Sequence, residues 1–297
     1  MRVRFYIAGD KQRELDIAEV VGHGIRACGD VFETAAAAAF VEPSDAEIAC
    51  VFALKGRARE ILDAYRLAGA RTLLFDKGLI RASTGMGAPM GYFRVALDEF
   101  MPLARMTGRR WPSSRWLATG MAPLPQQQKT EGGRIIYAGS SQKYCDFHGL
   151  GDATEYASDI IRQIGKHLPK PRKRDWPIVY RPKPSWADAV PIAGTIFSRP
   201  PEALGSLLRG AHALVTHGSH AAIDAILAGV PAVVLGPGAA RPVASTSLED
   251  IAAGLRFPAH AERLAWLSAL AWWQWRVEEM QDGSMWRFLR AEMERPS

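Results

Sequence analysis

The sequence has few cysteines and no long apolar run. Its 297 residues include three cysteines, Cys28, Cys50 and Cys145. They are widely spaced and form no C-x-x-C pair, so neither a disulfide framework nor a zinc site is expected. No stretch approaches the roughly 18 consecutive apolar residues that a membrane-spanning helix needs. Residues 1–11 lack the apolar region of a signal peptide. We therefore expect a cytoplasmic protein with no membrane span.

Several catalytic motifs are also absent. There is no G-x-x-x-x-G-K-[ST] motif, so phosphate is not held as in a P-loop kinase. The lack of a D-x-D pair argues against a metal-bridged nucleotide site, and the lack of G-x-S-x-G leaves a hydrolase triad without its nucleophile turn. Residues 22–27 match G-x-G-x-x-A, but they fall inside an expected helix instead of after a strand. That match is a weak dinucleotide fingerprint.

The composition is that of an ordinary globular protein, with 48% hydrophobic and 23% charged residues. The net charge of +6 allows a polyanionic partner without requiring one. Positive charge is spread along the chain, and its densest cluster, residues 166–174, has the pattern of a solvated loop between a helix and a strand.

Apolar strands alternate with segments of helical periodicity in both halves of the chain. Strands are expected at 3–8, 47–54 and 72–75, and again at 134–138, 177–180, 213–215 and 232–235. The polar, breaker-rich segment 121–133 is the best linker. This pattern predicts an α/β protein with two Rossmann-like domains facing a cleft. We expect an acceptor-side domain at 1–128 and a donor domain at 129–297, whose C-terminal helix can pack back on the first domain.

Ligands of open α/β sheets bind outside the carboxyl ends of the strands. There the strand at 213–215 runs into Thr216-His217-Gly218-Ser219 and a helix, so unpaired N–H groups and the Ser219 hydroxyl are expected to form an anion site. The structural alternative is that Ser219 only caps the helix and Asp224 is a surface carboxylate. His217 and His220 have H-x-x-H spacing but no third ligand, so no metal site is expected.

The segment 212–236 resembles the donor-binding half of GT-B glycosyltransferases, through Thr216-His217-Gly218-Ser219, Asp224 and Ala228-Gly229-Val230-Pro231. It is most similar to capsule-polysaccharide-type and phage-encoded glycosyltransferase-like proteins, and Arg181-Pro182-Lys183-Pro184 resembles their basic turn. The resemblance implies that Gly218 and Ser219 hold the donor diphosphate and Asp224 the ribose, where the family usually has Glu. Arg181 and Lys183 would then neutralise the leaving nucleotide. No metal or cofactor is implied beyond the nucleotide-sugar co-substrate.

The candidate site residues follow from these turns and from the resemblance. The donor-binding candidates are Ser140, Ser141, Lys143, Arg181, Lys183, Thr216, His217, Gly218, Ser219, Asp224 and Arg241. A base that deprotonates the acceptor hydroxyl is expected at a strand end. Asp76 is preferred, Asp10 and His148 are the other candidates, and either aspartate has a purely structural alternative.

The predicted function is sugar transfer from a nucleotide-sugar donor to a hydroxyl acceptor. The basic charge and the phage-like resemblance favour hydroxymethylated DNA bases, whereas the capsule-like resemblance favours a surface polysaccharide or its lipid-linked precursor. The tryptophans of the last two helices either pack between the domains or form a stacking surface for a sugar or for flipped bases; they are Trp266, Trp272, Trp273, Trp275 and Trp286. A sugar-nucleotide epimerase shares the architecture, and a non-catalytic nucleotide- or nucleic-acid-binding protein on the same scaffold is the alternative of another class. The oligomeric state is open.

Overall fold

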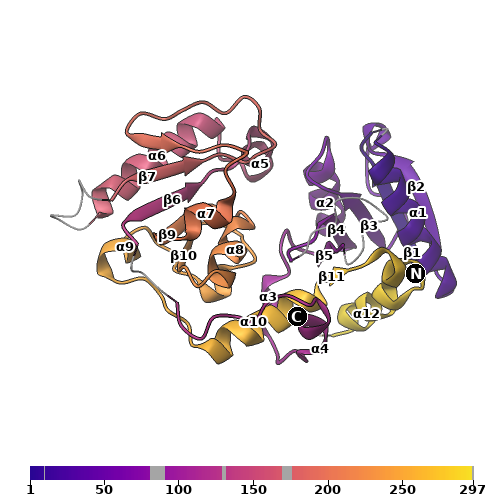
Figure 1. Ribbon diagram of the computed structural model, residues 1–297. Helices are drawn as coiled ribbons and strands as arrows, with labels where there is room; N and C mark the ends of the chain where they lie inside the picture. The colour runs from indigo at the N-terminus through magenta and orange to yellow at the C-terminus, as the bar shows by residue number, and fades with distance from the viewer. Residues whose placement is uncertain (10, 81–90, 129–131, 169–175, 296–297) are drawn as a thin grey trace. The chain divides into compact units, whose positions relative to one another are not determined.

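The computed structural model describes residues 1–9, 11–80, 91–128, 132–168 and 176–295, and the chain divides into two compact units (Figure 1). Unit 1 comprises Met1–Gly120 and Leu267–Ser297, and unit 2 comprises Met121–Trp266. The sequence placed the domain boundary after residue 128 and assigned everything beyond it to the second domain. In the structure the change falls at Gly120, and Leu267–Ser297 belongs to unit 1.

Unit 1 is built on a six-stranded sheet in the order β11-β5-β4-β3-β1-β2. β1 to β4 are parallel to one another, whereas β5 pairs antiparallel with both β4 and β11. β3 is buried along its whole length, as its continuous apolar sequence suggests. The strands are β1 (Arg2–Ile7), β2 (Val31–Ala36), β3 (Ile48–Phe52), β4 (Arg71–Lys77), β5 (Phe93–Leu97) and β11 (Gln274–Trp275).

The helices of unit 1 pack closely where the chain has glycine. A Cβ at Gly24 in α1 would lie 1.9 Å from the Met280 carbonyl oxygen of α11. The Gly22-His23-Gly24 pattern therefore serves helix packing, which agrees with its weakness as a nucleotide fingerprint. The helical elements are α1 (Gln12–Ala27), η1 (Ala37–Ala39), α2 (Ala58–Leu67), α3 (Leu103–Thr107), α4 (Ser114–Ala118), α11 (Val277–Gln281) and α12 (Ser284–Met293), with α10 (His260–Trp272) crossing from unit 2.

Arg115 of α4 ties the segment 267–297 into unit 1. Its guanidinium donates to the carbonyl oxygens of Ala271 and Gln274 and pairs with Glu279 at 2.6 Å. It also lies over the Trp275 ring, 4.1 Å from the ring centroid. Gln274 in turn accepts hydrogen bonds from the N–H groups of residues 79 and 80. These contacts fix β11 at the edge of the sheet.

Unit 2 holds a five-stranded parallel sheet in the order β10-β9-β6-β7-β8. The expected strands at 134–138, 177–180, 213–215 and 232–235 are confirmed, with small changes at their ends. The strands are β6 (Arg134–Ala138), β7 (Ile178–Arg181), β8 (Thr195–Phe197), β9 (Ala211–Thr216) and β10 (Ala232–Val234). The helical elements are α5 (Gln142–His148), α6 (Ala153–His167), α7 (Leu204–Leu208), α8 (Ala221–Leu227), η3 (Arg241–Val243) and α9 (Asp250–Ala253).

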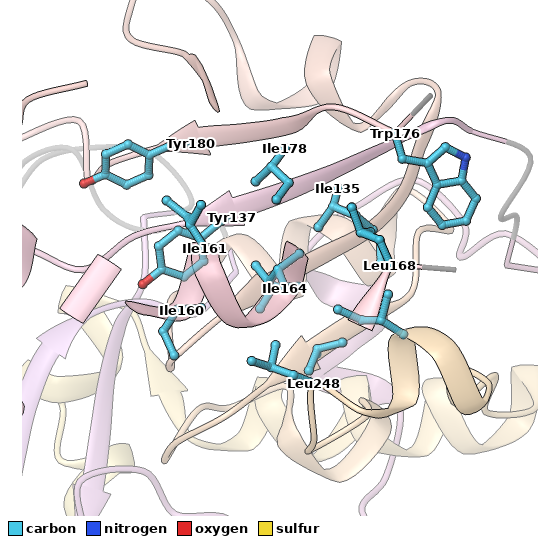
Figure 2. Close-up of a cluster of buried hydrophobic side chains, with 14 of the residues drawn as sticks. Ile135, Tyr137, Ile160, Ile161, Ile164, Leu168, Trp176, Ile178, Tyr180 and Leu248 are labelled. Atoms are coloured by element: carbon cyan, nitrogen blue, oxygen red, sulfur yellow. The ribbon is translucent and has the colours of Figure 1, made fainter. Parts of the chain in front are cut away.

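The core of unit 2 lies between α6 and one face of its sheet (Figure 2). Ile160, Ile161 and Ile164 of α6 pack against side chains of β6 and β7, as the helical spacing of these isoleucines predicts. Tyr137 and Tyr180 lie at one end of this cluster and Trp176 at the other. The two tyrosines belong to neighbouring strands in register and stack at 5.9 Å between ring centroids. This rigid core supports the carboxyl ends of β6 and β7.

Candidate functional site

The strand order of unit 2 singles out one point on its sheet. The chain begins at the centre with β6, continues to β7 and β8 on one side, and then crosses to β9 and β10 on the other. The turns after β6 and β9 therefore lead away from each other at the carboxyl edge. In open parallel sheets this topological switch point is where ligands bind. We call the residues 139–142 and 216–219 that leave β6 and β9 there the switch-point site.

The turn after β6 leaves its polar groups free. Within the described chain, the backbone N–H groups of Ser140, Ser141 and Gln142 have no acceptor, and neither serine hydroxyl has a hydrogen-bond partner. Ser141 precedes α5 without capping it through its side chain. Gly139 is required here, because a Cβ would lie 2.8 Å from the Tyr180 ring. Three adjacent N–H donors and two hydroxyls are thus open to an anion.

The turn after β9 uses its polar groups internally. The Thr216 hydroxyl donates to the Ala138 carbonyl oxygen at 2.8 Å and accepts from the Ser219 N–H at 3.1 Å. Ser219 Oγ accepts from the Ala221 N–H at 3.2 Å. The sequence expected orphan N–H groups here. The structure corrects this in part, because the N–H groups of Ser219 and Ala221 are already bonded, and Ser219 Oγ accepts the first N–H of α8. The Gly218 N–H has no acceptor in the described chain.

His217 is the side chain of this turn that is positioned for a ligand. Its Nδ1 lies 2.6 Å from the Tyr156 hydroxyl of α6. Burial and the charge of Arg241 lower the pKa of His217, so the imidazole is neutral at pH 7. No described residue pairs with Nε2. A Cβ at residue 236 would lie 2.0 Å from that nitrogen, which explains Gly236.

The turn after β10 adjoins the turn after β9, as the sequence expected. The Gly236 N–H donates to the His217 carbonyl oxygen at 2.6 Å. A Cβ at Gly238 would lie 3.0 Å from the Cα of Gly218. Arg241 is exposed and donates to the Gly236 carbonyl oxygen over 3.3 Å. Arg241 therefore adds positive charge at the rim of the site without being fixed to it.

Arg181 has a structural set of partners. Its side chain is only 8% exposed, and it donates to the Ser198 hydroxyl at 2.8 Å and to the Glu202 carbonyl oxygen at 2.7 Å. The sequence assigned it to the leaving pyrophosphate. The structure instead directs its guanidinium at residues 198–202, because Arg181 is the last residue of a buried strand and not part of the turn. Lys183 is exposed and stays a candidate.

Asp224 lies on α8, four residues after the His220 that begins it. Its carboxylate has no hydrogen-bond or ion-pair partner in the described chain, and the residue is exposed. Burial nevertheless raises the pKa of Asp224 to about 6. The two observations fit a carboxylate that lies close to many protein atoms and still reaches solvent. Its contact with a ribose stays a prediction.

The other predicted residues of unit 2 lie on α5. Lys143 is exposed, and the His148 ring packs on the Tyr144 ring at 4.3 Å between centroids. The His148 ring also lies 6.0 Å from that of His217, which places His148 beside the switch-point site of unit 2. The sequence nominated His148 as a base. Its position favours a packing role around the imidazole of His217.

The predicted bases of unit 1 have different outcomes. Asp76 is on β4, where its carboxylate pairs at 3.3 Å with the buried Arg94 of β5. That pairing favours the structural alternative, since a buried guanidinium requires a counter-charge. Asp10 lies outside the described residues.

A buried ion pair in unit 1 was missed by the sequence reading. The order β4-β3-β1-β2 puts the switch point of this sheet between β1 and β3. Near the carboxyl ends of these strands, the fully buried Glu14 of α1 accepts from the Ala8 N–H and pairs with Lys55 Nζ, both at 2.7 Å. Ala53 has φ of +61°, a strained backbone for a residue other than glycine. Lys55-Gly56 after the strand was the available signal in the sequence.

The tryptophans of the segment 267–297 form a packing cluster within unit 1. Trp273 and Trp275 are buried, and their rings lie 5.4 and 5.1 Å from the Phe288 ring. Trp272 donates its indole N–H to the Pro112 carbonyl oxygen. Packing is therefore the role that the contacts support, and a stacking platform for bases is not what Trp273 and Trp275 present.

The described residues support neither a metal site nor a membrane-spanning helix. Among the described residues, no group of three or more His, Cys, Asp or Glu side chains could hold a metal ion. In the same part of the chain, no helix combines the length and apolarity that crossing a membrane requires.

No protein-family model and no curated protein matches the sequence. Solved structures do match it over nearly the whole chain. The β-Kdo 2,4 transferase of Thermosulfurimonas dismutans KpsC aligns with a TM-score of 0.55 and 14% identity, covering 92% of this chain and 91% of that one. The β-Kdo 2,7 transferase of the same protein aligns with a TM-score of 0.50 and 12% identity, covering 91% and 99%. The expected fold class is confirmed: the chain has two Rossmann-like domains, and its fold is similar to that of these transferases.

Proposed function

We propose that this protein is a glycosyltransferase that moves a sugar from a nucleotide-sugar to a hydroxyl acceptor, with the donor phosphate at the switch-point site of unit 2. The observation that carries the proposal is the turn after β6. Its three adjacent N–H groups at residues 140–142 and its two serine hydroxyls have no partner in the described chain. Unpaired donors at this position of an α/β sheet are the usual way to hold phosphate.

The site supplies hydrogen bonds to the phosphate oxygens. Charge that develops on the departing phosphate is stabilised by the N–H groups of 140–142, by the Gly218 N–H and by the exposed Arg241. His217 adds its imidazole from the opposite turn. The donors are held by rigid strands, because Thr216 ties the end of β9 to the end of β6. The hydrogen-bond donors around a departing phosphate therefore do not have to reorganise as its charge develops.

We propose a saccharide as the acceptor, in preference to DNA. The relatives in fold are named as Kdo transferases, which act on sugars. The buried indoles of Trp273 and Trp275 do not offer a surface on which bases could stack. Lys55, held by Glu14 at the carboxyl edge of unit 1, is the side chain we assign to the acceptor side. Asp76 and Asp10 stay candidate bases.

The first experiment is a thermal-shift screen of UDP, GDP, ADP, CMP and their sugars on the full-length protein. A ligand at 100 times its dissociation constant stabilises the fold by about 2.7 kcal/mol. We expect one nucleotide series to stabilise the wild type and the double substitution Ser140→Ala, Ser141→Ala to weaken that effect. Ser206→Ala, at an exposed serine of α7, is the matched control.

The hit then serves in turnover assays. Transfer to an oligosaccharide with little salt dependence supports the proposal, whereas DNA as acceptor predicts binding that weakens steeply with salt. Interconversion of the sugar nucleotide without an acceptor would identify an epimerase. Binding without any turnover would identify a non-catalytic nucleotide-binding protein. If no nucleotide stabilises the fold, the proposal fails.

A further inference from the structure

His217 and Tyr156 form a pair that the sequence did not suggest. Tyr156 is on α6 and His217 follows β9, so 61 residues separate them. The hydroxyl oxygen lies 2.6 Å from Nδ1, and the two rings meet edge to face at 5.5 Å between centroids. The ring of His217 is therefore held both by a short hydrogen bond and by packing.

The proton on this hydrogen bond can be assigned from the groups around it. Burial raises the pKa of Tyr156 to about 12, so the phenol keeps its hydrogen at neutral pH. The one hydrogen-bond partner that the described chain offers this hydroxyl is Nδ1 of His217. A neutral imidazole carries one hydrogen, on either nitrogen. If Nδ1 accepts from the phenol, that hydrogen is on Nε2.

The other nitrogen of the imidazole has no partner in the described chain. No described residue accepts from Nε2, and the imidazole occupies the place that a side chain at residue 236 would take. The ionisable and polar rings that face His217 are Tyr156 of α6 and, from α5, Tyr144 and His148. Arg241 of η3 is the charged neighbour, and its field together with burial keeps the imidazole neutral.

We propose that Tyr156 is a positioning residue that holds His217 with its proton on Nε2, so that His217 donates a neutral hydrogen bond to a phosphoryl oxygen of the bound nucleotide. The inference rests on the proposed function for its ligand and adds a specific donor to it. A second cation at this position would repel Arg241. A neutral N–H donor avoids that repulsion and still pairs with an anionic oxygen.

The proton assignment is tested on the full-length protein without any ligand. In protein labelled with [15N]histidine, the nitrogen shifts report which ring nitrogen carries the hydrogen. We expect Nε2 to be protonated and Nδ1 to be the acceptor in the wild type. In Tyr156→Phe we expect a mixture of tautomers and a raised pKa of His217, because a hydrogen bond to the neutral form has been removed. A hydrogen on Nδ1 of the wild type overturns the proposal.

The matched control is Tyr180→Phe, which removes a buried hydroxyl that has no partner in the described chain. This variant should leave the tautomer and the pKa of His217 as in the wild type. If Tyr180→Phe changed them as much as Tyr156→Phe does, the effect would be general loosening of the core and the proposal would fail. A purely structural role of Tyr156 predicts a loss of stability with an unchanged tautomer.

The hydrogen bond from His217 to a phosphoryl oxygen is tested by titrating the protein with UDP, GDP, ADP and CMP. We expect His217→Gln, whose amide N–H₂ reaches the place of Nε2, to keep most of the affinity. In His217→Asn the amide lies near the place of Nδ1 instead. His217→Asn and Tyr156→Phe should each weaken nucleotide binding roughly 3- to 10-fold, the effect of losing one hydrogen bond. Equal losses for Gln and Asn would contradict a donor at Nε2. If no nucleotide binds the wild type, the proposed function and the phosphate contact fail together, while the tautomer result stands separately.

Discussion

The turn after β6 and the turn after β9 contain the same kinds of residue and differ in where their N–H groups are directed. Both join glycine to serine at the carboxyl end of a buried strand, and both lead into a seven-residue helix. After β9 the Ser219 N–H and the Ala221 N–H bond to hydroxyl oxygens of the same turn. After β6 the N–H groups of 140–142 have no described acceptor.

The turn after β9 uses its hydrogen bonds to hold two strands together, whereas the turn after β6 keeps its donors available for a ligand. A hydroxyl at the last residue of β9, Thr216, turns the second turn into a brace between two strands. The corresponding residue of β6 is Ala138, which has no hydroxyl to offer. The last residue of each strand therefore determines whether the N–H groups of the following turn find an acceptor within that turn. Substitutions at five positions can break or sharpen this contrast.

The largest effect is expected for Thr216→Val, which keeps the shape of the side chain and removes its hydroxyl. The Ser219 N–H and the Ala138 carbonyl oxygen would both lose their partner next to a fully buried side chain. We expect the free energy of unfolding to fall by about 2 kcal/mol, measured by urea denaturation. Thr216→Ser retains the hydroxyl and should stay within about half of that loss. Equal stability of Val and wild type would show that the turn after β9 is not a brace.

The open turn is tested by Gln142→Pro compared with Gln142→Ala. Residue 142 is the first of α5, where proline fits, and Ser141 before it has the extended conformation that proline requires. Both substitutions remove the side chain, but only proline removes the N–H. We expect nucleotide affinity to be about 10-fold weaker in the proline variant than in the alanine variant, as for one charge-assisted hydrogen bond. Identical affinities would exclude this N–H as a phosphate ligand.

Two serines should respond in opposite ways. Ser219→Ala removes the hydrogen bond to the first N–H of α8 and should lower the free energy of unfolding by about 1 kcal/mol, with nucleotide affinity nearly unchanged. Ser141 has no cap hydrogen bond, so Ser141→Ala should leave stability unchanged and weaken nucleotide binding about 3-fold. Thermal denaturation with and without nucleotide measures both effects. If both substitutions changed only the stability, or both changed only the nucleotide affinity, the two turns would not differ in their roles.

The smallest effect is expected for Asp224→Asn and depends on pH. The folded-state pKa of Asp224, about 6, lies above that of an unfolded chain. The folded state therefore binds this proton more tightly, and the stability linked to Asp224 is present below the unfolded pKa and lost as pH rises through about 6. We expect the amide variant to match the wild type at pH 3.5 and to be slightly more stable at pH 7. Melting curves at several pH values would contradict this if the difference were largest in acid.

The fold was predictable because buried strands of parallel sheets have distinctive sequences. β3 and β6 are continuous apolar runs followed by glycine or polar turns, and the sequence located both. β2 was missed, because an edge strand with Glu33 and Thr34 does not show that pattern. β11 has two residues, and its pairing with β5 depends on contacts far apart in the chain.

The site was only partly predictable, because its decisive contacts are tertiary. The turns could be read from their glycines and serines, and the structure brings those after β6, β9 and β10 to one edge. The direction of the Arg181 side chain depends on Ser198 and Glu202, and the role of His217 depends on Tyr156. No spacing in the sequence encodes these partners. The sequence also does not show which hydrogen bonds a turn makes internally. For this reason the turn after β9 was predicted to be the anion site.

The return of Leu267–Ser297 to unit 1 has a consequence for how the protein is made. All of unit 2 emerges from the ribosome before Gln274 and Trp275, which provide the edge strand β11. Unit 2 can therefore complete its sheet during synthesis. At that stage unit 1 still lacks Glu279, the ion-pair partner of Arg115, and its strand β5 is an unpaired edge strand. An exposed edge strand is a template for wrong pairing. Nascent chains that stall before residue 274 should thus hold a folded unit 2 beside an incomplete unit 1 that chaperones must protect.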